Sequence, residues 1–320
     1  MSFLKKYRPH RFEDYLPNQS YIDALKLFIK MDCLTVLIIG NNGSGRTTLI
    51  HTILREYYGT DTINDDNILF INRLHDQGIR YFRTEVKTFC QTSCEIPGKK
   101  KSLILDDIDI INEQCQQVFR NYIDKYSSNI NFIASCVNTQ KVIDSIQSRC
   151  TIVKIKPFGT STLNIIYNKI MKEEKLNIDS EAGDFILNVS NNSIRLLLNY
   201  LEKIKIYDGK ITIFNVKEIC THISFNDFDE YTRLWNTERD LDKAIAFMFK
   251  IQEKGYSVMD ILDDYFLYIK TIRMNELYKY EIIKIVCKYI TIFHTVHEDD
   301  LELACLTYDL FNFKQNHDMN

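Results

Sequence analysis

The first half of the chain alternates short runs of β-branched and other apolar residues with longer stretches of helical periodicity. This alternation is typical of a parallel β-sheet covered by helices, because each strand returns to the sheet through a helix. The apolar runs predict strands over residues 34–39, 68–71, 102–105, 131–135 and 151–155. The stretches between them predict helices over 47–58, 79–91 and 113–126. We therefore expect an α/β domain here.

The periodicity becomes helical throughout after Lys156-Pro157-Phe158-Gly159. Helices are predicted over 161–175, 180–189 and 193–206. Each of these segments begins with a serine, whose side chain can cap the free N–H groups of a first helical turn. Apolar spacing predicts further helices over 261–277 and 282–294. The pattern therefore indicates an α/β region up to about residue 157, followed by a region that is helical throughout.

Composition narrows the class of protein. No apolar run approaches the roughly 20 residues that a membrane span requires. Lys5, Lys6 and Arg8 come early with no apolar stretch behind them, so we expect no secretory signal. The nine cysteines lie in apolar segments and form no CxxC pair, so we expect free, buried thiols in a reducing compartment, nuclear or cytoplasmic, rather than disulfides or zinc. A net charge of −3 argues against a free-standing DNA binder, because such proteins are normally basic.

A glycine-rich loop between a strand and a helix is the strongest chemical signal. It consists of Gly40, Asn41, Asn42, Gly43, Ser44, Gly45, Arg46, Thr47 and Thr48. Loops of this kind bind phosphates, because glycines turn backbone N–H groups inward and the helix N-terminus adds partial positive charge. Thr47 stands where a hydroxyl ligates Mg²⁺. The alternative is a plain Gly/Asn-rich turn, which the flanking strand and helix disfavour.

Position 46 departs from the motif, which has lysine there. The guanidinium of Arg46 keeps the charge on a longer, planar group that is not interchangeable with an ammonium. Nucleotide binding tolerates this change better than hydrolysis does. We therefore expect slow hydrolysis at this site, with Arg46→Lys raising the rate.

A second signal is the apolar run 103–105, which ends in acids. In the Walker B strand of an ATPase the first acid holds Mg²⁺ and the next polarises the attacking water. Asp106 and Asp107 fit these two roles. Asp107 stands where related ATPases place glutamate, so its carboxylate is one methylene shorter. A plain acidic turn after a buried strand is the alternative.

Several short motifs occur in an order that resembles the small subunits of replication factor C, which are AAA+ proteins. They are Lys6-Tyr7-Arg8-Pro9 with Phe12-Glu13-Asp14, then Asp76-Gln77-Gly78-Ile79-Arg80-Tyr81-Phe82-Arg83, Gln116-Gln117-Val118-Phe119-Arg120, Cys136-Val137-Asn138, Ser148-Arg149-Cys150 and Ser193-Ile194-Arg195. The match runs from about residue 3 to residue 205. Beyond it only helical character and total length agree.

The resemblance implies three domains. They are a RecA-like parallel-sheet domain over residues 1–157, a helical lid over residues 158–224 and an all-α collar over residues 225–320 that oligomerises. It implies an ATP-binding subunit, with ATP and Mg²⁺ as cofactors, in a pentameric hetero-oligomeric clamp loader. Such a complex opens a PCNA-like sliding clamp and loads it onto primer–template DNA during DNA replication. No membrane is involved.

The resemblance also implies roles for single residues. Leu4 and Arg8 would line the adenine side of the pocket. Asn138 would orient the attacking water or contact the γ-phosphate, and Arg195 would report nucleotide from the lid. Arg149 would project toward the ATP of the adjacent subunit and act in trans. Its alternative is an ordinary surface arginine.

A basic strip is the candidate DNA contact. It consists of Arg73, Arg80, Arg83 and Lys87. The last three lie three and four residues apart, so they share one side of a helix. In the resembled family this helix points at the duplex, where phosphate contacts position the protein without reading sequence. A solvated helix face is the alternative.

Two rival functions stay open. The first is a structural subunit that binds ATP, lends Arg149 to a neighbour and hydrolyses little. Arg46 and Asp107 favour it, whereas Thr47, Asp106 and Asn138 favour an ATPase. The second is another AAA+ DNA enzyme, such as a branch-migration motor or an initiator, which the motifs around Arg8 and Arg149 disfavour.

Overall fold

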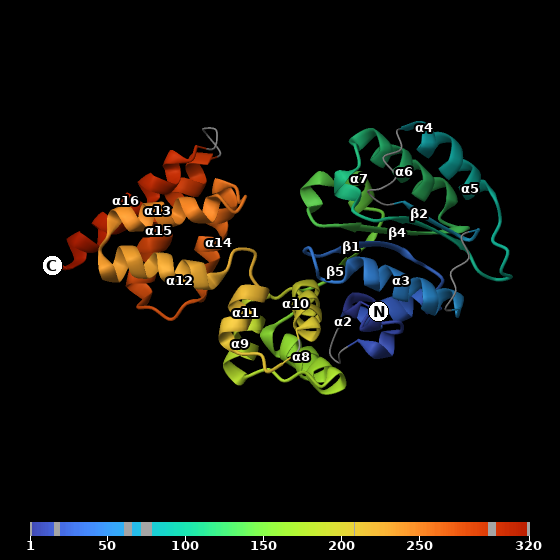
Figure 1. The fold of residues 1–320 in the computed structure, drawn as a ribbon. Helices are drawn as coiled ribbons and strands as arrows, with labels where there is room; N and C mark the ends of the chain where they lie inside the picture. Colours follow the sequence, from blue (N-terminus) through green and yellow to red (C-terminus); the bar gives the residue numbers. More distant parts are fainter. Residues whose placement is uncertain are drawn as a thin grey trace. The chain divides into compact units, whose positions relative to one another are not determined.

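The computed structural model describes residues 2–15, 20–60, 66–71, 79–207, 209–293 and 299–318 (Figure 1). Within them, contacts separate two compact units. The first comprises residues 1–166 and 192–198, and the second comprises residues 167–191 and 199–320. The finer division into three domains at residues 157 and 224 remains a proposal.

The first unit contains the expected parallel sheet. Its strands are β1 (Thr35–Ile39), β2 (Ile68–Ile71), β3 (Lys101–Leu105), β4 (Ile130–Cys136) and β5 (Thr151–Lys154). They lie in the order β2-β3-β4-β1-β5, and every pairing is parallel. Ala134 of the central strand β4 pairs with Leu37 of β1 on one side and with Leu105 of β3 on the other. The predicted α/β fold is confirmed, and the strand bounds agree within one residue.

Apolar cores on both faces explain why β3 and β4 are buried along their whole length. Alternate residues face opposite ways, so Leu37 joins one core and Val36 joins the other. Helices α2 (Ser20–Lys30) and α3 (Arg46–Tyr58) contribute Leu25 and Ile53 to the second core. Helix α6 (Glu113–Tyr126) covers the other face with Phe119. Figure 1 shows α3 and α6 on opposite sides of the sheet.

The predicted helix over 79–91 is helical throughout but not uniform. It runs as α4 (Ile79–Tyr81), a π-helical segment Phe82–Val86 and α5 (Lys87–Gln91). Phe82, Val86 and Cys90 recur every fourth residue and are all buried. In an α-helix of 3.6 residues per turn, side chains spaced four residues apart drift around the helix axis. The wider turn of the π-helical segment offsets this drift, so the three side chains stay in one core.

Short helical turns connect the remaining parts of the first unit. They are α1 (Phe3–Lys6), α7 (Asp144–Gln147) and single 3₁₀ turns over Phe12–Asp14, Ile108–Ile110 and Thr139–Lys141. The last two follow β3 and β4 directly. They therefore occupy the carboxyl edge of the sheet, where parallel α/β proteins place their binding sites.

The middle of the chain forms α8 (Thr160–Glu174), α9 (Ser180–Val189), α10 (Ile194–Ile206) and α11 (Ile213–Ile219). The three helices predicted here are confirmed within one residue. The capping prediction holds for Ser193 alone, whose Oγ accepts a bond from the N–H of Leu196 at 3.4 Å. Ser161 and Ser180 instead lie inside the first turns of α8 and α9, so they cannot act as N-caps.

The last part of the chain forms α12 (Phe225–Arg233), a π-helical segment Leu234–Glu238, α13 (Leu241–Gln252), α14 (Val258–Thr271), α15 (Glu276–Phe293) and α16 (Leu301–Asp318). The prediction of one helix over 261–277 is wrong. Ser257 and Asp260 form a capping box at the start of α14, and Ile272 is extended. Asn275 then accepts from the N–H of Leu277 at 3.0 Å, so a new helix begins before the one predicted at 282. His294, its predicted end, lies outside the described residues.

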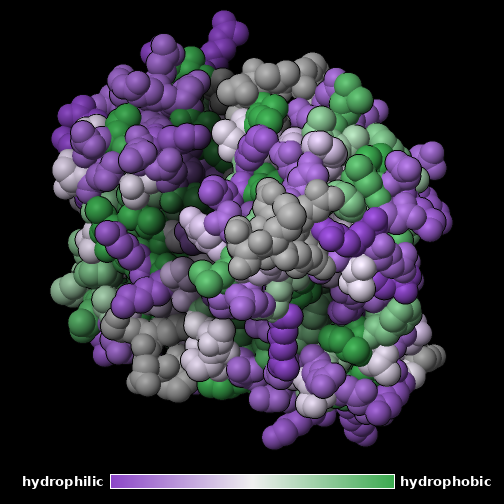
Figure 2. All heavy atoms as spheres, turned by 90° about the vertical axis from the view of Figure 1, so that its left-hand side faces the viewer, coloured by the Kyte–Doolittle hydropathy of each residue, from purple (hydrophilic) through white to green (hydrophobic). Residues whose placement is uncertain are grey.

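Aromatic side chains fill the core of this helical part. Trp235, Tyr231 and Tyr265 are fully buried, and the indole N–H of Trp235 donates to the Tyr265 hydroxyl at 3.2 Å. Hydrophilic side chains cover most of the face seen in Figure 2, with hydrophobic ones interspersed. Among the described residues, no helix has both the length and the apolar character that crossing a bilayer requires.

Candidate nucleotide-binding site

The loop from Gly40 to Thr48 joins β1 to α3 and has the backbone of a phosphate cradle. Gly43 and Gly45 adopt φ angles of +77° and +90°, which side chains of L-residues rarely tolerate. Gly45 is the N-cap of α3 and has no side chain to accept from the first turn. The free N–H groups of that turn are therefore available to an anionic ligand.

Close packing also requires glycine in this loop. A Cβ at Gly40 would lie 2.6 Å from Ser44 Oγ, and one at Gly43 would lie 2.6 Å from Ser193 Oγ. Ser44 is only 6% exposed, and its buried hydroxyl has no hydrogen-bond partner among the described residues. A buried, unsatisfied hydroxyl beside free N–H groups fits a phosphate ligand.

Two adjacent contacts link the start of α3 to the end of β3. The hydroxyl of Thr47 donates to Asp106 Oδ2 at 2.8 Å. Arg46 precedes Thr47 and Asp107 follows Asp106, and these two residues are also in contact. Arg46 Nη1 lies 2.8 Å from Asp107 Oδ1. The predicted metal ligands are thus brought together, and so are the two residues that depart from the pattern of related ATPases.

Ser135 of β4 supports both acids. Its hydroxyl donates to Asp106 Oδ1 at 2.5 Å and accepts from the N–H of Asp107 at 3.1 Å. Sequence reasoning missed Ser135. The available signal was a polar residue near the end of a largely apolar strand, at the same sheet edge as Asp106.

Asp107 leaves the strand in a left-handed conformation, with φ 59° and ψ 53°. Aspartate tolerates this region better than most residues. Asp107 lies opposite Arg46, and the two side chains are 17% and 9% exposed. The contact is therefore a largely buried ion pair.

Asn138 lies just beyond the carboxyl end of β4. Its backbone N–H and that of Val137 donate to Asp109 Oδ2 at 3.0 and 3.2 Å. Its side-chain oxygen accepts from the N–H of Gln140 at 2.9 Å. In this structure the exposed Asn138 amide therefore caps the following turn.

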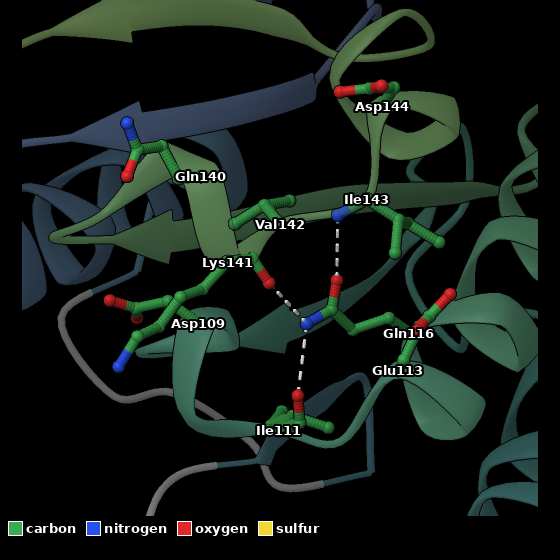
Figure 3. A pocket seen from close by; sticks show the side chains of 9 residues that line it. All are labelled: Asp109, Ile111, Glu113, Gln116, Gln140, Lys141, Val142, Ile143 and Asp144. Carbon is green, nitrogen blue, oxygen red and sulfur yellow. Dashed lines mark hydrogen bonds between the residues drawn. The ribbon is translucent and has the colours of Figure 1, made fainter.

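Gln116 holds the two turns that follow β3 and β4. Its Nε2 donates to the carbonyls of Ile108, Ile111 and Lys141 at 3.0–3.2 Å. Its Oε1 accepts from the N–H of Ile143 at 3.0 Å, so the buried amide is fully used. Figure 3 shows Gln116 pointing between the two turns at the wall of an open pocket of about 580 Å³. The sequence motif had marked this glutamine without revealing its contacts.

The N-terminal segment packs on α3 beside the loop. Arg8 Nη2 donates to the carbonyl of Thr47 at 3.5 Å, and Leu4 is 38% exposed on α1. Burial, followed by the nearby Arg55, lowers the pKa of Arg8. Burial, Arg8 and Arg55 also lower the pKa of His51 to about 4, so His51 is neutral at pH 7. Sequence reasoning missed His51 and Arg55.

The Cβ of Arg195 lies near the glycine loop. A Cβ placed on Gly43 would come 3.8 Å from the Cβ of Arg195, and the Arg195 side chain is exposed. Its implied role in reporting nucleotide remains a proposal.

Arg149 follows α7 and is held by its own chain. Its Nε lies 2.5 Å from Asp124 Oδ1, and its Nη1 donates to the carbonyl of Ser145 at 2.8 Å. Arg120 approaches the same carboxylate at 3.3 Å. The hydrogen bond from Arg149 is the main cause that lowers the pKa of Asp124.

The basic strip is exposed on one helical stretch. Arg80, Arg83 and Lys87 lie on α4, the π-helical segment and α5. Arg73, the fourth predicted member, lies outside the described residues. All nine cysteines are free thiols, as expected from their spacing, but the prediction that they are buried is wrong for the exposed Cys33, Cys287 and Cys305.

Comparisons with known proteins agree with the fold and the loop. Residues 36–158 match the family model of AAA proteins, the ATPase family associated with various cellular activities. Residues 36–158 are therefore similar to the ATPase domain of that family.

Similarity to replication factor C proteins extends over most of the chain. A protein of Acanthamoeba polyphaga mimivirus, named for a replication factor C small subunit, is 29% identical over 89% of this chain and 88% of its own length. The replication factor C small subunit of Methanoregula boonei is 26% identical over 88% and 87%. Human replication factor C subunit 5 is 26% identical over 84% and 79%.

Solved structures share the fold. The RuvB Holliday junction branch migration motor of Thermotoga maritima superposes with a TM-score of 0.54 at 15% identity, over 86% of this chain and 98% of its own. Such a low identity shows the fold alone, so it does not favour the branch-migration rival. The chain is therefore an α/β protein of the AAA+ fold, and the proteins that it resembles along most of its length are the replication factor C small subunits.

Proposed function

We propose that this chain is an ATP-binding subunit of a clamp-loader complex that opens a PCNA-like sliding clamp and loads it onto primer–template DNA during DNA replication. The paired contacts Thr47–Asp106 and Arg46–Asp107 at the glycine loop carry the nucleotide-binding part of this proposal. The names of the relatives along most of the chain support the clamp-loader part.

The residues at the loop fit ATP with Mg²⁺. Bound there, the nucleotide supplies a phosphoryl group whose cleavage the metal assists by neutralising charge. The N–H groups of 43–48 and the Arg46 guanidinium bind phosphates, and the oxygens of Thr47 and Asp106 hold the metal. Ser135 fixes the orientation of the Asp106 carboxylate through its hydrogen bond.

Three further side chains complete the proposed site. Asp107 accepts a proton from the attacking water, and Asn138 orients that water once its amide leaves the turn. Arg195 approaches the phosphates from the lid. Leu4 and Arg8 line the adenine side, since Arg8 contacts the first turn of α3.

Arg149 is proposed to serve the site of a neighbouring subunit. A guanidinium on developing phosphoryl charge is worth about 10³–10⁵ in rate. Arg149 is 31% exposed and can leave Asp124 for a phosphate, because Asp124 keeps Arg120 as a partner. The proposed partners are the other subunits of a pentameric complex, which acts at replication sites in the nucleus or cytoplasm.

The exposed strip Arg80, Arg83 and Lys87 is proposed to contact the DNA backbone. The net charge of −3 makes tight binding by the isolated chain unfavourable, so the assembled complex supplies the rest of the basic surface.

A hydrolysis-poor structural subunit is the second candidate. The observation that favours it is the Arg46–Asp107 ion pair, which engages the carboxylate of the proposed base. In that case the chain would bind ATP and lend Arg149 to a neighbour while its own site turns over slowly.

Reconstitution tests the proposed function. The chain is assembled with its co-purifying partner subunits, and ATP-dependent loading of a sliding clamp onto primed DNA is measured. We expect loading by the wild type and reduced loading with Thr47→Val, which removes the hydroxyl and keeps the volume. A complex that assembles but loads no clamp would refute the clamp-loader role, and unchanged ATPase activity in the Arg46→Lys and Asp107→Asn complexes would favour the structural subunit.

A further inference from the structure

Arg46 and Asp107 are the two positions where the loop and the β3 turn depart from the pattern of related ATPases, and they contact each other. Their charged atoms lie 2.8 Å apart. Two independent departures would not have to meet. Contact between them indicates that one departure accommodates the other.

The covalent lengths of the two side chains explain the contact. Arginine carries its charge one atom farther from the backbone than lysine does, and aspartate carries its charge one atom nearer than glutamate does. The sum of the two lengths is therefore the same for Arg46 with Asp107 as for a lysine with a glutamate. Between backbones in fixed positions, the gap is filled equally well by both combinations.

Local contacts restrict both ends of the pair. Arg46 Cγ lies close to Gly40, since a Cβ there would come 3.4 Å from it. The N–H of Asp107 donates to Ser135, and Asp107 has a left-handed φ of 59°. A change in the length of either side chain is therefore expected to alter the contact between them.

The pair is also largely buried, which makes its balance of charge important. The side chains of Arg46 and Asp107 are 9% and 17% exposed. The second terminal nitrogen, Arg46 Nη2, makes a long contact of 3.4 Å to Asn42 Oδ1. One nitrogen of the guanidinium thus contacts the carboxylate, and the other contacts a side chain of the glycine loop.

We propose that Arg46 and Asp107 form a compensated pair, in which Arg46 is the positioning residue for Asp107 and each departure is functional only with the other. Arg46 holds the carboxylate at the mouth of the glycine loop before nucleotide arrives. The contact with Asp107 also keeps the Arg46 guanidinium in place for a phosphate, so the fit of the pair sets the affinity of the site. This inference rests on the proposed nucleotide site.

The compensated pair changes what a lysine at position 46 is expected to do. Taken alone, Arg46→Lys shortens one partner and leaves a gap to Asp107. Asp107→Glu alone overfills the same gap. Only the double variant Arg46→Lys/Asp107→Glu restores the length and the charge together.

A double-mutant cycle on the full chain tests the pair. Thermal unfolding of the nucleotide-free protein is measured for the wild type, both single variants and the double variant. We expect each single variant to lower Tm by about 2–4 °C and the double variant to recover most of this loss. Affinities for a fluorescent ATP analogue are measured in parallel. We expect each single variant to weaken binding about tenfold and the double variant to restore it.

Two controls separate the pair from general effects. Arg233→Lys with Glu230→Asp alters an exposed ion pair in the second unit, and we expect no change in nucleotide affinity. If Asp107→Glu fails to fold, the charge-removing cycle of Arg46→Gln and Asp107→Asn measures the same coupling.

Strictly additive losses of Tm in the nucleotide-free cycle would overturn the compensated pair. That result would leave the proposed function intact if the wild type still binds the ATP analogue. A wild type that binds no nucleotide would refute the proposed site, whereas coupled Tm values would still support the ion pair as a matched structural unit.

Discussion

Arg149 and Asp124 lie in contact within one chain, with 2.5 Å between Arg149 Nε and Asp124 Oδ1. Arg120, which lies on helix α6 together with Asp124, contacts the same carboxylate. In the chain by itself, the arginine proposed to act in trans is therefore held in place by an exposed acid. Exposed ion pairs are weak, so the contact presents Arg149 without locking it.

Replacement of Arg149 by alanine should lower ATP hydrolysis by the assembled complex and leave this chain's own nucleotide affinity unchanged. The physical reason is that the guanidinium stabilises charge on a neighbour's phosphate. We expect a loss of about 10³-fold at the site that receives it. The measurement is the ATPase rate of the complex, with nucleotide affinity of the isolated chain measured beside it. Arg233→Ala, at another exposed ion-paired arginine, is the matched control. Weakened ATP binding by the isolated Arg149→Ala chain would show that this arginine belongs to its own site.

Gln116→Ala should destabilise the first unit strongly. The substitution leaves the carbonyls of Ile108, Ile111 and Lys141 and the N–H of Ile143 without their partner. Unpaired buried polar groups cost about 1–3 kcal/mol each, and entry of water reduces the total, so we expect a loss of about 3 kcal/mol. Denaturant unfolding measures it.

The adjacent Gln117 provides the control for Gln116. Its side chain is exposed and makes one bond to Glu113 at 3.3 Å. Gln117→Ala should change the free energy of unfolding by no more than about 0.5 kcal/mol. Equal effects at the two positions would mean that the network around Gln116 does not hold the turns.

The triple variant Arg80→Ala, Arg83→Ala and Lys87→Ala should weaken DNA binding by the assembled complex and flatten its salt dependence. Each phosphate contact contributes about 0.9 to the slope of log affinity against log salt concentration, so up to three contacts are at stake. The control replaces three exposed basic residues elsewhere in the chain, Lys169, Lys172 and Lys284. An unchanged salt slope in the Arg80 series would assign these residues to a solvated face.

His51 should make the protein less stable as pH falls from about 6.5 toward 4. Its pKa in the folded protein is lowered to about 4, mainly by burial, whereas the unfolded chain takes up the proton near 6.5. Protonation therefore favours the unfolded state over this window. Allowing for partial solvent screening, we expect about 1 kcal/mol to be lost between pH 7 and pH 5. Denaturant unfolding of the wild type and of His51→Gln at both pH values measures this, and an equal loss in the variant would exclude His51 as the cause.

The sheet was predictable because its strands are short, apolar and separated by helices of ordinary length. Leu37, Phe132 and Leu105 lie in runs that only a buried strand explains. The break between α14 and α15 was not predictable from periodicity, since Ile272 and Met274 continue the apolar pattern. Asn275, as an N-cap, decides the break locally.

The candidate site was predictable residue by residue but not as a set of contacts. The sequence places Arg46 and Asp107 on separate elements, and only strand register and the left-handed turn at Asp107 bring them together. Ser135 directly precedes the motif at residues 136–138 but is not part of it, and its role depends on the adjacency of β3 and β4. For the same reason, the resemblance marked Gln116 but could not show which turns it joins.

Equilibrium titration of the isolated, folded chain with a fluorescent ATP analogue, with and without Mg²⁺, tests the central claim most directly. The claim is that the glycine loop, Thr47 and Asp106 form a nucleotide site. We predict saturable binding that Mg²⁺ strengthens, and a loss of that strengthening in Thr47→Val. Absence of saturable binding by a chain that unfolds cooperatively, and is therefore intact, would contradict the account.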